Sequence, residues 1–135
     1  NEKYVPVHEL VTIITTKGVL VCYIINSIGE VSGKDSDKHL IVKHDNKRFK
    51  IKGPKETIDK HIKGITDKCG ELPIEVCYFF KKGVDFSAFK TEAKVAYYKD
   101  AIKVLEGMSN HLSEQEVETC YKSLTTHLVK EEKDA

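Results

Sequence analysis

The chain has 135 residues, of which 40% are hydrophobic and 32% charged, and a formal net charge of +1 at pH 7. This length suits a single domain over residues 1–135, and no apolar run approaches the roughly 18 residues of a membrane span, so we expect no membrane insertion. The small net charge, and Arg48 as the sole arginine among 22 basic residues, argue against specific nucleic-acid recognition.

The first half of the chain predicts two β-hairpins separated by a loop. Residues 7–16 and 19–25 are rich in β-branched side chains and flank Lys17-Gly18, where glycine suits a tight turn. Residues 27–38 hold glycines, serines and small charged residues, which predicts an exposed loop. Residues 40–43 and 49–52 flank a turn that contains Asp45 and Asn46, which predicts the second hairpin.

The second half predicts helices around one further strand. Apolar residues recur every three or four positions from Ile58 to Cys69, which predicts a helix that ends at Gly70, and alternation over 74–80 predicts a strand. The stripe from Phe86 to Leu105 predicts a long helix ending at Gly107, and a capping-box spacing at Ser113 begins a last helix.

Together these elements predict an α+β fold. We expect an antiparallel β-sheet with one interposed helix and a C-terminal helical hairpin packed on one face of the sheet.

The four cysteines are predicted to point inward. Cys22 and Cys77 interrupt strand-like apolar runs, while Cys69 and Cys120 fall on the apolar stripes of helices. An even number of such cysteines in a short chain that opens at Asn1 is typical of a secreted protein with two disulfides. We therefore expect an extracellular protein, either mature after removal of a signal peptide or a domain excised from a longer precursor.

Three pairings of the four cysteines remain open. A bond from Cys69 to Cys77 requires a splayed connection, because a strand running back along the helix places these residues about 13 Å apart. A bond from Cys22 to Cys120 closes a long loop and is worth about 4 kcal/mol. The opposing interpretation is four reduced core thiols in a cytosolic protein.

The second hairpin is a candidate binding surface. Residues 34–63 contain ten basic and five acidic residues, and the basic ones include a hairpin cluster formed by Lys43, Lys47, Arg48, Lys50 and Lys52. This cluster suits an acidic surface on a host or cell-surface protein, or a sulfated glycan. The plainer interpretation is a solvated edge whose lysines prevent strand-to-strand aggregation.

A concentration of aromatic residues offers a different function. Seven of the eleven aromatic residues lie between Tyr78 and Tyr98, and such a cluster either fills the core or lines a pocket for an apolar ligand.

No pattern in the chain predicts catalysis. The six histidines lack metal-ligand spacing, phosphate-loop and nucleophile motifs are absent, and cysteines in apolar settings are poor nucleophiles, so we expect no catalytic, cofactor or metal site. The sequence therefore predicts a secreted or surface-displayed, non-enzymatic binding protein, such as a parasite or viral factor that acts on a host macromolecule. A carrier of a lipid-like ligand is the first alternative and a proteinase inhibitor the second.

Overall fold

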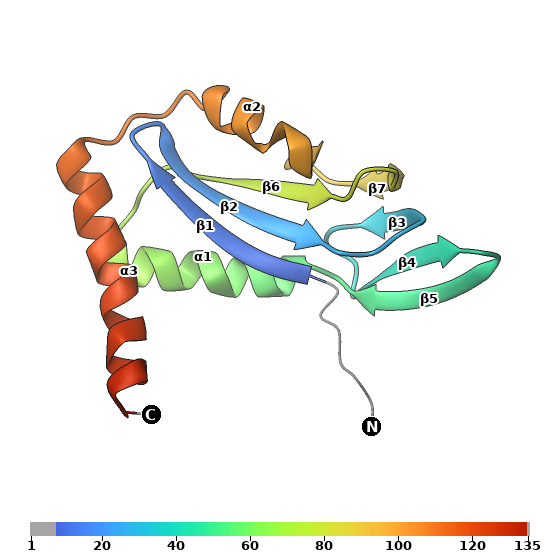
Figure 1. Ribbon diagram of the computed structural model, residues 1–135, viewed down its shortest axis with the longest axis horizontal. Helices are drawn as coiled ribbons and strands as arrows, with labels where there is room; N and C mark the ends of the chain where they lie inside the picture. The colour runs from blue at the N-terminus through green and yellow to red at the C-terminus, as the bar shows by residue number, and fades with distance from the viewer. Residues whose placement is uncertain (1–7, 135) are drawn as a thin grey trace.

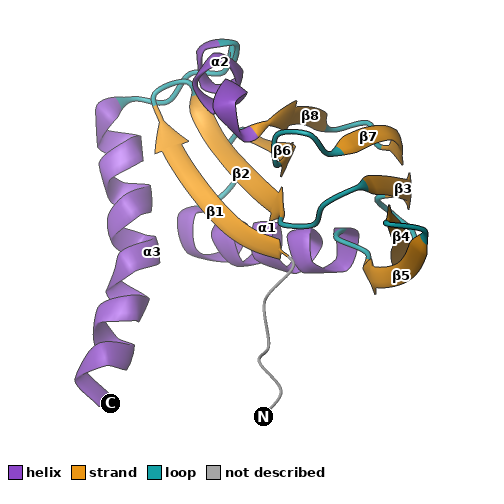
Figure 2. Cartoon of the chain, turned by 45° about the vertical axis from the view of Figure 1, so that its right-hand side comes forward, coloured by secondary structure: helices purple, strands orange, loops and turns teal. Residues whose placement is uncertain are grey.

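The computed structural model describes residues 8–134 of the chain, and the side chains of residues 9–125. These residues form an α+β fold with two mixed four-stranded sheets (Figures 1 and 2). Sheet A has the strand order β1 (His8–Thr15), β2 (Gly18–Ile25), β6 (Ile74–Phe80) and β8 (Lys94–Tyr97). Sheet B has the order β5 (Lys47–Lys52), β4 (His39–His44), β3 (Glu30–Lys34) and β7 (Asp85–Lys90).

The helices surround sheet A. Helix α1 (Lys55–Cys69) lies beneath it, and α2 (Ala101–Glu106), which follows the short 3₁₀ helix η1 (Tyr98–Asp100), lies above it (Figure 1). Helix α3 (Glu114–Asp134) runs past one end of the sheet and contacts α1 and β1. The hairpin of β4 and β5 projects at the opposite end of the molecule (Figure 1).

A hydrophobic cluster packs against each of the two faces of sheet A. The larger lies between sheet A, sheet B and α1, and it contains Tyr23, Tyr78, Phe80, Leu40 and Ile58. The smaller lies on the α2 side and contains Leu20, Cys22, Cys77, Phe79 and Met108. Alternate residues of β2 and β6 therefore belong to different clusters, which is why β2 is apolar throughout and β6 is apolar except at Glu75.

Several predicted elements are confirmed. Both hairpins form, and Asp45 and Asn46 take positive φ angles of 51° and 62°, as a two-residue type I′ turn requires. Helix α1 and strand β6 occupy the predicted segments. The capping box at α3 also forms, with the Glu116 amide donating to the Ser113 hydroxyl at 3.1 Å and the Ser113 amide to the Glu116 carboxylate at 3.0 Å.

The prediction of one antiparallel sheet is wrong. The pairs β2–β6, β6–β8 and β3–β7 are parallel, and the strands form two sheets. Between β2 and β6 the chain first builds most of sheet B and then returns along α1. A helical crossover brings the chain back to the start of the neighbouring strand, so the pairing is parallel.

The predicted C-terminal helical hairpin is also wrong. Residues 85–97 form β7 and β8, and only residues 98–106 are helical before Gly107. The register between β3 and β7 shifts between Glu30 and Ser32, which is a β-bulge. The extra residue lets Phe86 and Phe89 both face the interior at a spacing of three, and this spacing imitates a helical stripe.

The predicted loop over 27–38 contains strand β3. Val31 is fully buried, while its neighbours in the strand are polar or glycine. Pairing with β4 on one side and β7 on the other, rather than local propensity, makes this segment extended.

Candidate functional site

The outward-facing side of sheet B carries a patch of basic residues. Val31 and Val42 are paired and buried, so their neighbours Ser32 and Ile41 point to the other face, and the register continues this alternation across all four strands. On the exposed face it places six cations that we call the outer basic face: Lys34, Lys43, Arg48, Lys50, Lys52 and Lys90.

Four of the five predicted hairpin residues belong to the outer basic face. Lys47 does not, because it shares the opposite side of β5 with Ile51 and Phe49. Lys34 and Lys90, which are paired with each other across β3 and β7, complete the face instead. Their place on it depends on pairing between strands that are distant in the sequence.

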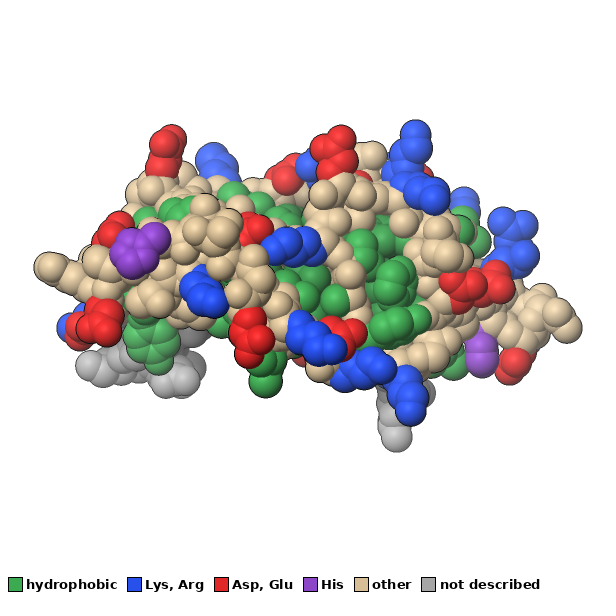
Figure 3. Space-filling model, turned by 90° about the horizontal axis from the view of Figure 1, so that it is seen from above, with side chains coloured by type: hydrophobic (Ala, Val, Ile, Leu, Met, Phe, Trp, Pro, Cys, Tyr) green, Lys and Arg blue, Asp and Glu red, His purple; other side chains and the backbone are tan. Residues whose placement is uncertain are grey.

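The cations of the outer basic face have few acidic neighbours, and of the six, Lys52 helps, after Lys60, to lower the pKa of the Glu56 carboxyl. Among residues 9–125, none of the six forms an ion pair, and Glu30 and Asp85 are the acidic residues that the register places on the same face. The α2 side of the molecule differs, because hydrophobic side chains gather in its middle and basic and acidic ones lie interspersed around them (Figure 3).

The structure brings the four cysteines together as two pairs. The Sγ atoms of Cys69 on α1 and Cys120 on α3 lie 2.9 Å apart, and Cys22 is directly opposite Cys77 in the β2–β6 ladder. All four are thiols in this structure. These two pairs differ from the two bonds considered from the sequence, Cys69 with Cys77 and Cys22 with Cys120. The disulfides themselves stay a prediction.

Burial suppresses the acidity of three of these thiols. Desolvation raises the pKa of Cys22 to about 11, and that of Cys77 to about 12 with a smaller contribution from Cys22. Burial and then the contact with Cys69 raise the pKa of Cys120 to about 12. A pKa of about 11 leaves about one thiol in a thousand ionised at pH 8.

We therefore expect the four cysteines to be alkylated at different rates when the reduced, folded protein is treated with iodoacetamide at pH 8. Cys69 is half-buried, whereas the other three are buried, so it should react first. Cys22 and Cys77 should react at least about a hundredfold more slowly than in the urea-unfolded chain, where thiols ionise near pH 8.5. Peptide mapping at timed intervals measures this order, and equal rates at all four sites would contradict it.

The aromatic residues pack mainly against one another. Tyr78 contacts Phe89 and Tyr23 edge to face, with ring centroids 5.0 and 5.8 Å apart, and Phe80 stacks on Phe86 at 4.8 Å. Phe79 points to the other side of sheet A, and Tyr98 is exposed. Most of these rings therefore fill the space between the two sheets and α1, as core residues do.

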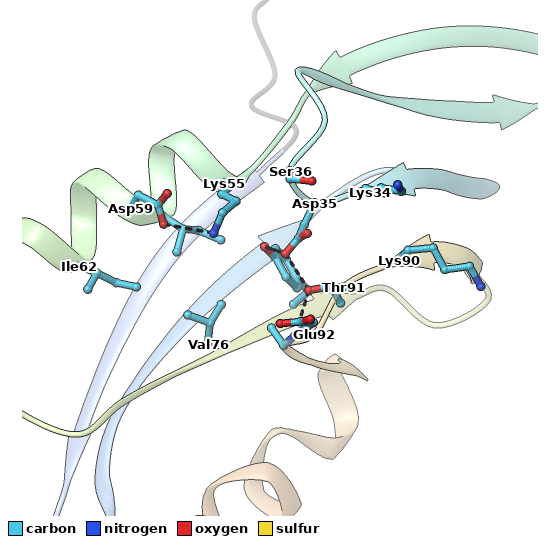
Figure 4. Close-up of a pocket in the computed structure, with 13 residues that line it drawn as sticks. Lys34, Asp35, Ser36, Lys55, Asp59, Ile62, Val76, Lys90, Thr91 and Glu92 are labelled. Carbon is cyan, nitrogen blue, oxygen red and sulfur yellow. Dashed lines mark hydrogen bonds and ion pairs between the residues drawn. The ribbon is translucent and has the colours of Figure 1, made fainter.

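A cavity of about 580 Å³ opens between α1, the middle of β6 and the ends of β3 and β7 (Figure 4). Its apolar lining consists of Ile58, Ile62, Val76 and Ala93. Its polar lining includes Asp35, whose Oδ2 atom accepts hydrogen bonds from the Tyr78 hydroxyl at 3.0 Å and the Thr91 hydroxyl at 2.7 Å.

Sequence reasoning missed this cavity. Asp35 is separated from Tyr78 by 43 positions and from Thr91 by 56, and nothing local connects them. Asp35 also lies in the segment predicted to be an exposed loop, where an acidic residue carries no special signal.

Comparisons with known proteins do not identify the function of these surfaces. Comparison of the chain with models of protein families, with curated proteins and with solved structures finds no significant match. Within the described residues, no group of three or more histidine, cysteine or acidic side chains is placed to hold a metal ion, and no helix is long and apolar enough to cross a membrane.

Proposed function

We propose that the protein is a non-enzymatic, extracellular binding protein that holds a sulfated polysaccharide, such as a cell-surface glycan, on the outer basic face. The observation that carries this proposal is the absence of ion pairs at six exposed cations within the described part of sheet B. Unpaired cations on one face attract a polyanion, and its binding releases the counterions of both partners.

The geometry of the face favours a linear polyanion over a protein. Arg48, Lys50 and Lys52 alternate along β5, so their Cα atoms lie about 7 Å apart, and neighbouring strands are about 4.8 Å apart. The face therefore presents a regular grid of positive charges. Stable protein interfaces bury aromatic anchors and are poor in lysine, whereas this face offers only Ile41 and Ala88 as apolar residues near its centre.

The composition of the face favours sulfate over nucleic-acid bases. Five of its six cations are lysines, which act as point charges and lack the planar fork that reads guanine. No aromatic side chain is placed on this face by the register, so stacking on unpaired bases is not supported either.

The extracellular location rests on the thiol pairs. Cys69 and Cys120 are already in contact, and Cys22 and Cys77 have Cα atoms about 4.8 Å apart, within the range that disulfides span. We include both bonds in the proposal, because an oxidising compartment would form them from these positions.

Charge reversal at Arg48 and Lys50 tests the glycan proposal. The double variant Arg48→Glu/Lys50→Glu changes the charge of the face from +4 to zero, counting Glu30 and Asp85. Its affinity for heparin at physiological salt should fall by at least about tenfold. Both side chains are exposed on an edge strand, so the fold should persist. Surface plasmon resonance on immobilised heparin measures the change.

Two controls make this test specific. The variant Lys63→Glu/Lys99→Glu carries the same change in net charge at exposed residues of α1 and η1, and should retain most of the heparin affinity. Raising the salt concentration should weaken the wild type more than the hairpin variant. Equal losses in both variants, or tighter binding to duplex DNA than to heparin at the same salt, would refute the proposal.

A further inference from the structure

The cavity between α1 and the strands has the properties of a site for a small ligand. Its volume of about 580 Å³ lies within the range of ordinary ligand pockets, and its lining combines an apolar floor with a few polar groups. The ligand class follows from three features: how Asp35 is held, which charges face the cavity, and what the floor can accommodate.

Asp35 is a carboxylate held in one orientation. The hydroxyls of Tyr78 and Thr91 both donate to Oδ2, and Thr91 is itself fixed because its Oγ1 accepts from the Ala93 amide at 3.0 Å. Tyr78 is only 2% exposed and is clamped between the rings of Tyr23 and Phe89. Within the described residues Oδ1 accepts no hydrogen bond, so one oxygen of a fixed anion is free.

The lysines around the cavity do not cancel this anion. Lys34 and Lys90 belong to the outer basic face, and Figure 4 shows the Lys90 side chain extending away from Asp35. Lys55 lies 3.7 Å from the carboxylate of Asp59 on the next turn of α1. Glu92 lines the cavity and forms no ion pair among residues 9–125. The charges that remain for a ligand are therefore carboxylates.

The floor of the cavity suits an aliphatic chain. Ile62 on α1 and Val76 on β6 face each other across the cavity (Figure 4). Ile58 and Ala93 complete its apolar lining. An unbranched chain of four or five methylene groups could cover this floor while its charged end reaches the carboxylate. An anionic ligand would instead place its charge beside Asp35 and Glu92.

We propose that this cavity binds a primary alkylammonium group, with Asp35 as its counter-ion and the floor of Ile58, Ile62, Val76 and Ala93 holding the alkyl chain. A free alkylamine and the lysine side chain of another protein present this same chemistry. Lys34 and Lys90 line the cavity and also belong to the outer basic face. The heparin test changes Arg48 and Lys50 and the amine test changes Asp35, so the two proposals can fail independently.

The test is a titration of the ¹⁵N-labelled protein with n-pentylamine at pH 7, followed by NMR. We expect saturable shifts at the amides around Asp35, Tyr78, Thr91 and Ala93. 1-Pentanol has the same chain without the charge and should bind at least about tenfold more weakly. A short peptide with one internal lysine, titrated in parallel, identifies the source, since tighter binding of the peptide points to a protein ligand and tighter binding of the amine to a free one.

Matched variants locate the site. Asp35→Asn keeps an oxygen that can accept from Tyr78 and Thr91 but removes the charge, and should weaken pentylammonium binding by about tenfold or more. Asp67→Asn makes the same change of net charge at an exposed residue of α1 outside the cavity, and should leave binding unchanged. If Asp35→Asn perturbs the fold, Glu92→Gln at the exposed rim should still weaken binding severalfold.

Three results would overturn the proposal. One is equal affinity for pentylamine and pentanol, and another is equal loss in the Asp35 and Asp67 variants. The third is the absence of saturable shifts at the cavity amides in the wild type.

Discussion

Replacing Gly29 with alanine is expected to lower the free energy of unfolding by about 4 kcal/mol. Gly29 has φ = +89°, where an L-residue is strained, and a Cβ atom there would overlap the carbonyl oxygen of Lys43. The Gly29 carbonyl also accepts from the Asp85 amide at 2.9 Å, so the residue cannot shift without disturbing β7. Urea unfolding followed by circular dichroism measures the loss.

Gly83 supplies a matched control for this prediction. It has the same φ of +89°, but no atom lies within 4 Å of a Cβ placed there. Gly83→Ala should therefore cost only the backbone strain, about 1 kcal/mol. The difference in the free energy of unfolding between the two variants measures the energetic cost of a Cβ atom where the β2–β3 connection approaches β4. Equal costs at both positions would show that this approach does not restrain sheet B.

The elements that could be predicted from the sequence are those whose signals are local. The hairpin turn at Asp45 and Asn46 depends on two residues that tolerate positive φ, and the capping box at Ser113 and Glu116 on residues three apart. Helix α1 has an apolar stripe that buries Ile58 and Ile65. In each case the interactions that decide the structure lie within a few positions of one another.

The elements that could not be predicted depend on contacts between distant segments. Phe86 and Phe89 look helical because a bulge in β7 spaces them three apart, and the bulge exists only against β3, some 55 residues earlier. Strand β3 itself has one buried apolar residue, Val31, and becomes a strand through its two partners. Parallel pairing of β6 with β2 and β8 likewise has no local signature.

The same distinction applies to the candidate sites. Lys43, Arg48, Lys50 and Lys52 could be predicted because one hairpin sets their alternation, whereas Lys34 and Lys90 join them only through the β3–β7 register. The sequence also predicted inward cysteines correctly at Cys22, Cys77 and Cys120, which are buried. It could not choose their partners, because the contact of α3 with α1 and the register of β2 with β6 are set by the whole fold.

Oxidation of the Cys69–Cys120 pair is expected to raise the free energy of unfolding by about 4 kcal/mol. The two residues are 51 positions apart, so a bond between them would restrict a long loop in the unfolded chain. With oxidised glutathione as the oxidant, the two thiols lose two protons and two electrons, and the glutathione disulfide is reduced to two thiols. The bond would also fasten α3, which otherwise contacts the body mainly through α1 and β1.

The variant Cys120→Ser, unfolded by urea with and without reductant, tests this prediction. Without reductant, the wild type should exceed the variant in stability by about 5 kcal/mol, and with reductant only the smaller cost of a buried hydroxyl, about 1 kcal/mol, should remain. Alkylation of the unfolded, unreduced wild type should modify no cysteine if Cys22 and Cys77 are joined as well. A difference between variant and wild type that reductant does not change would mean that Cys69 and Cys120 remain thiols, and the extracellular location would then lose its support.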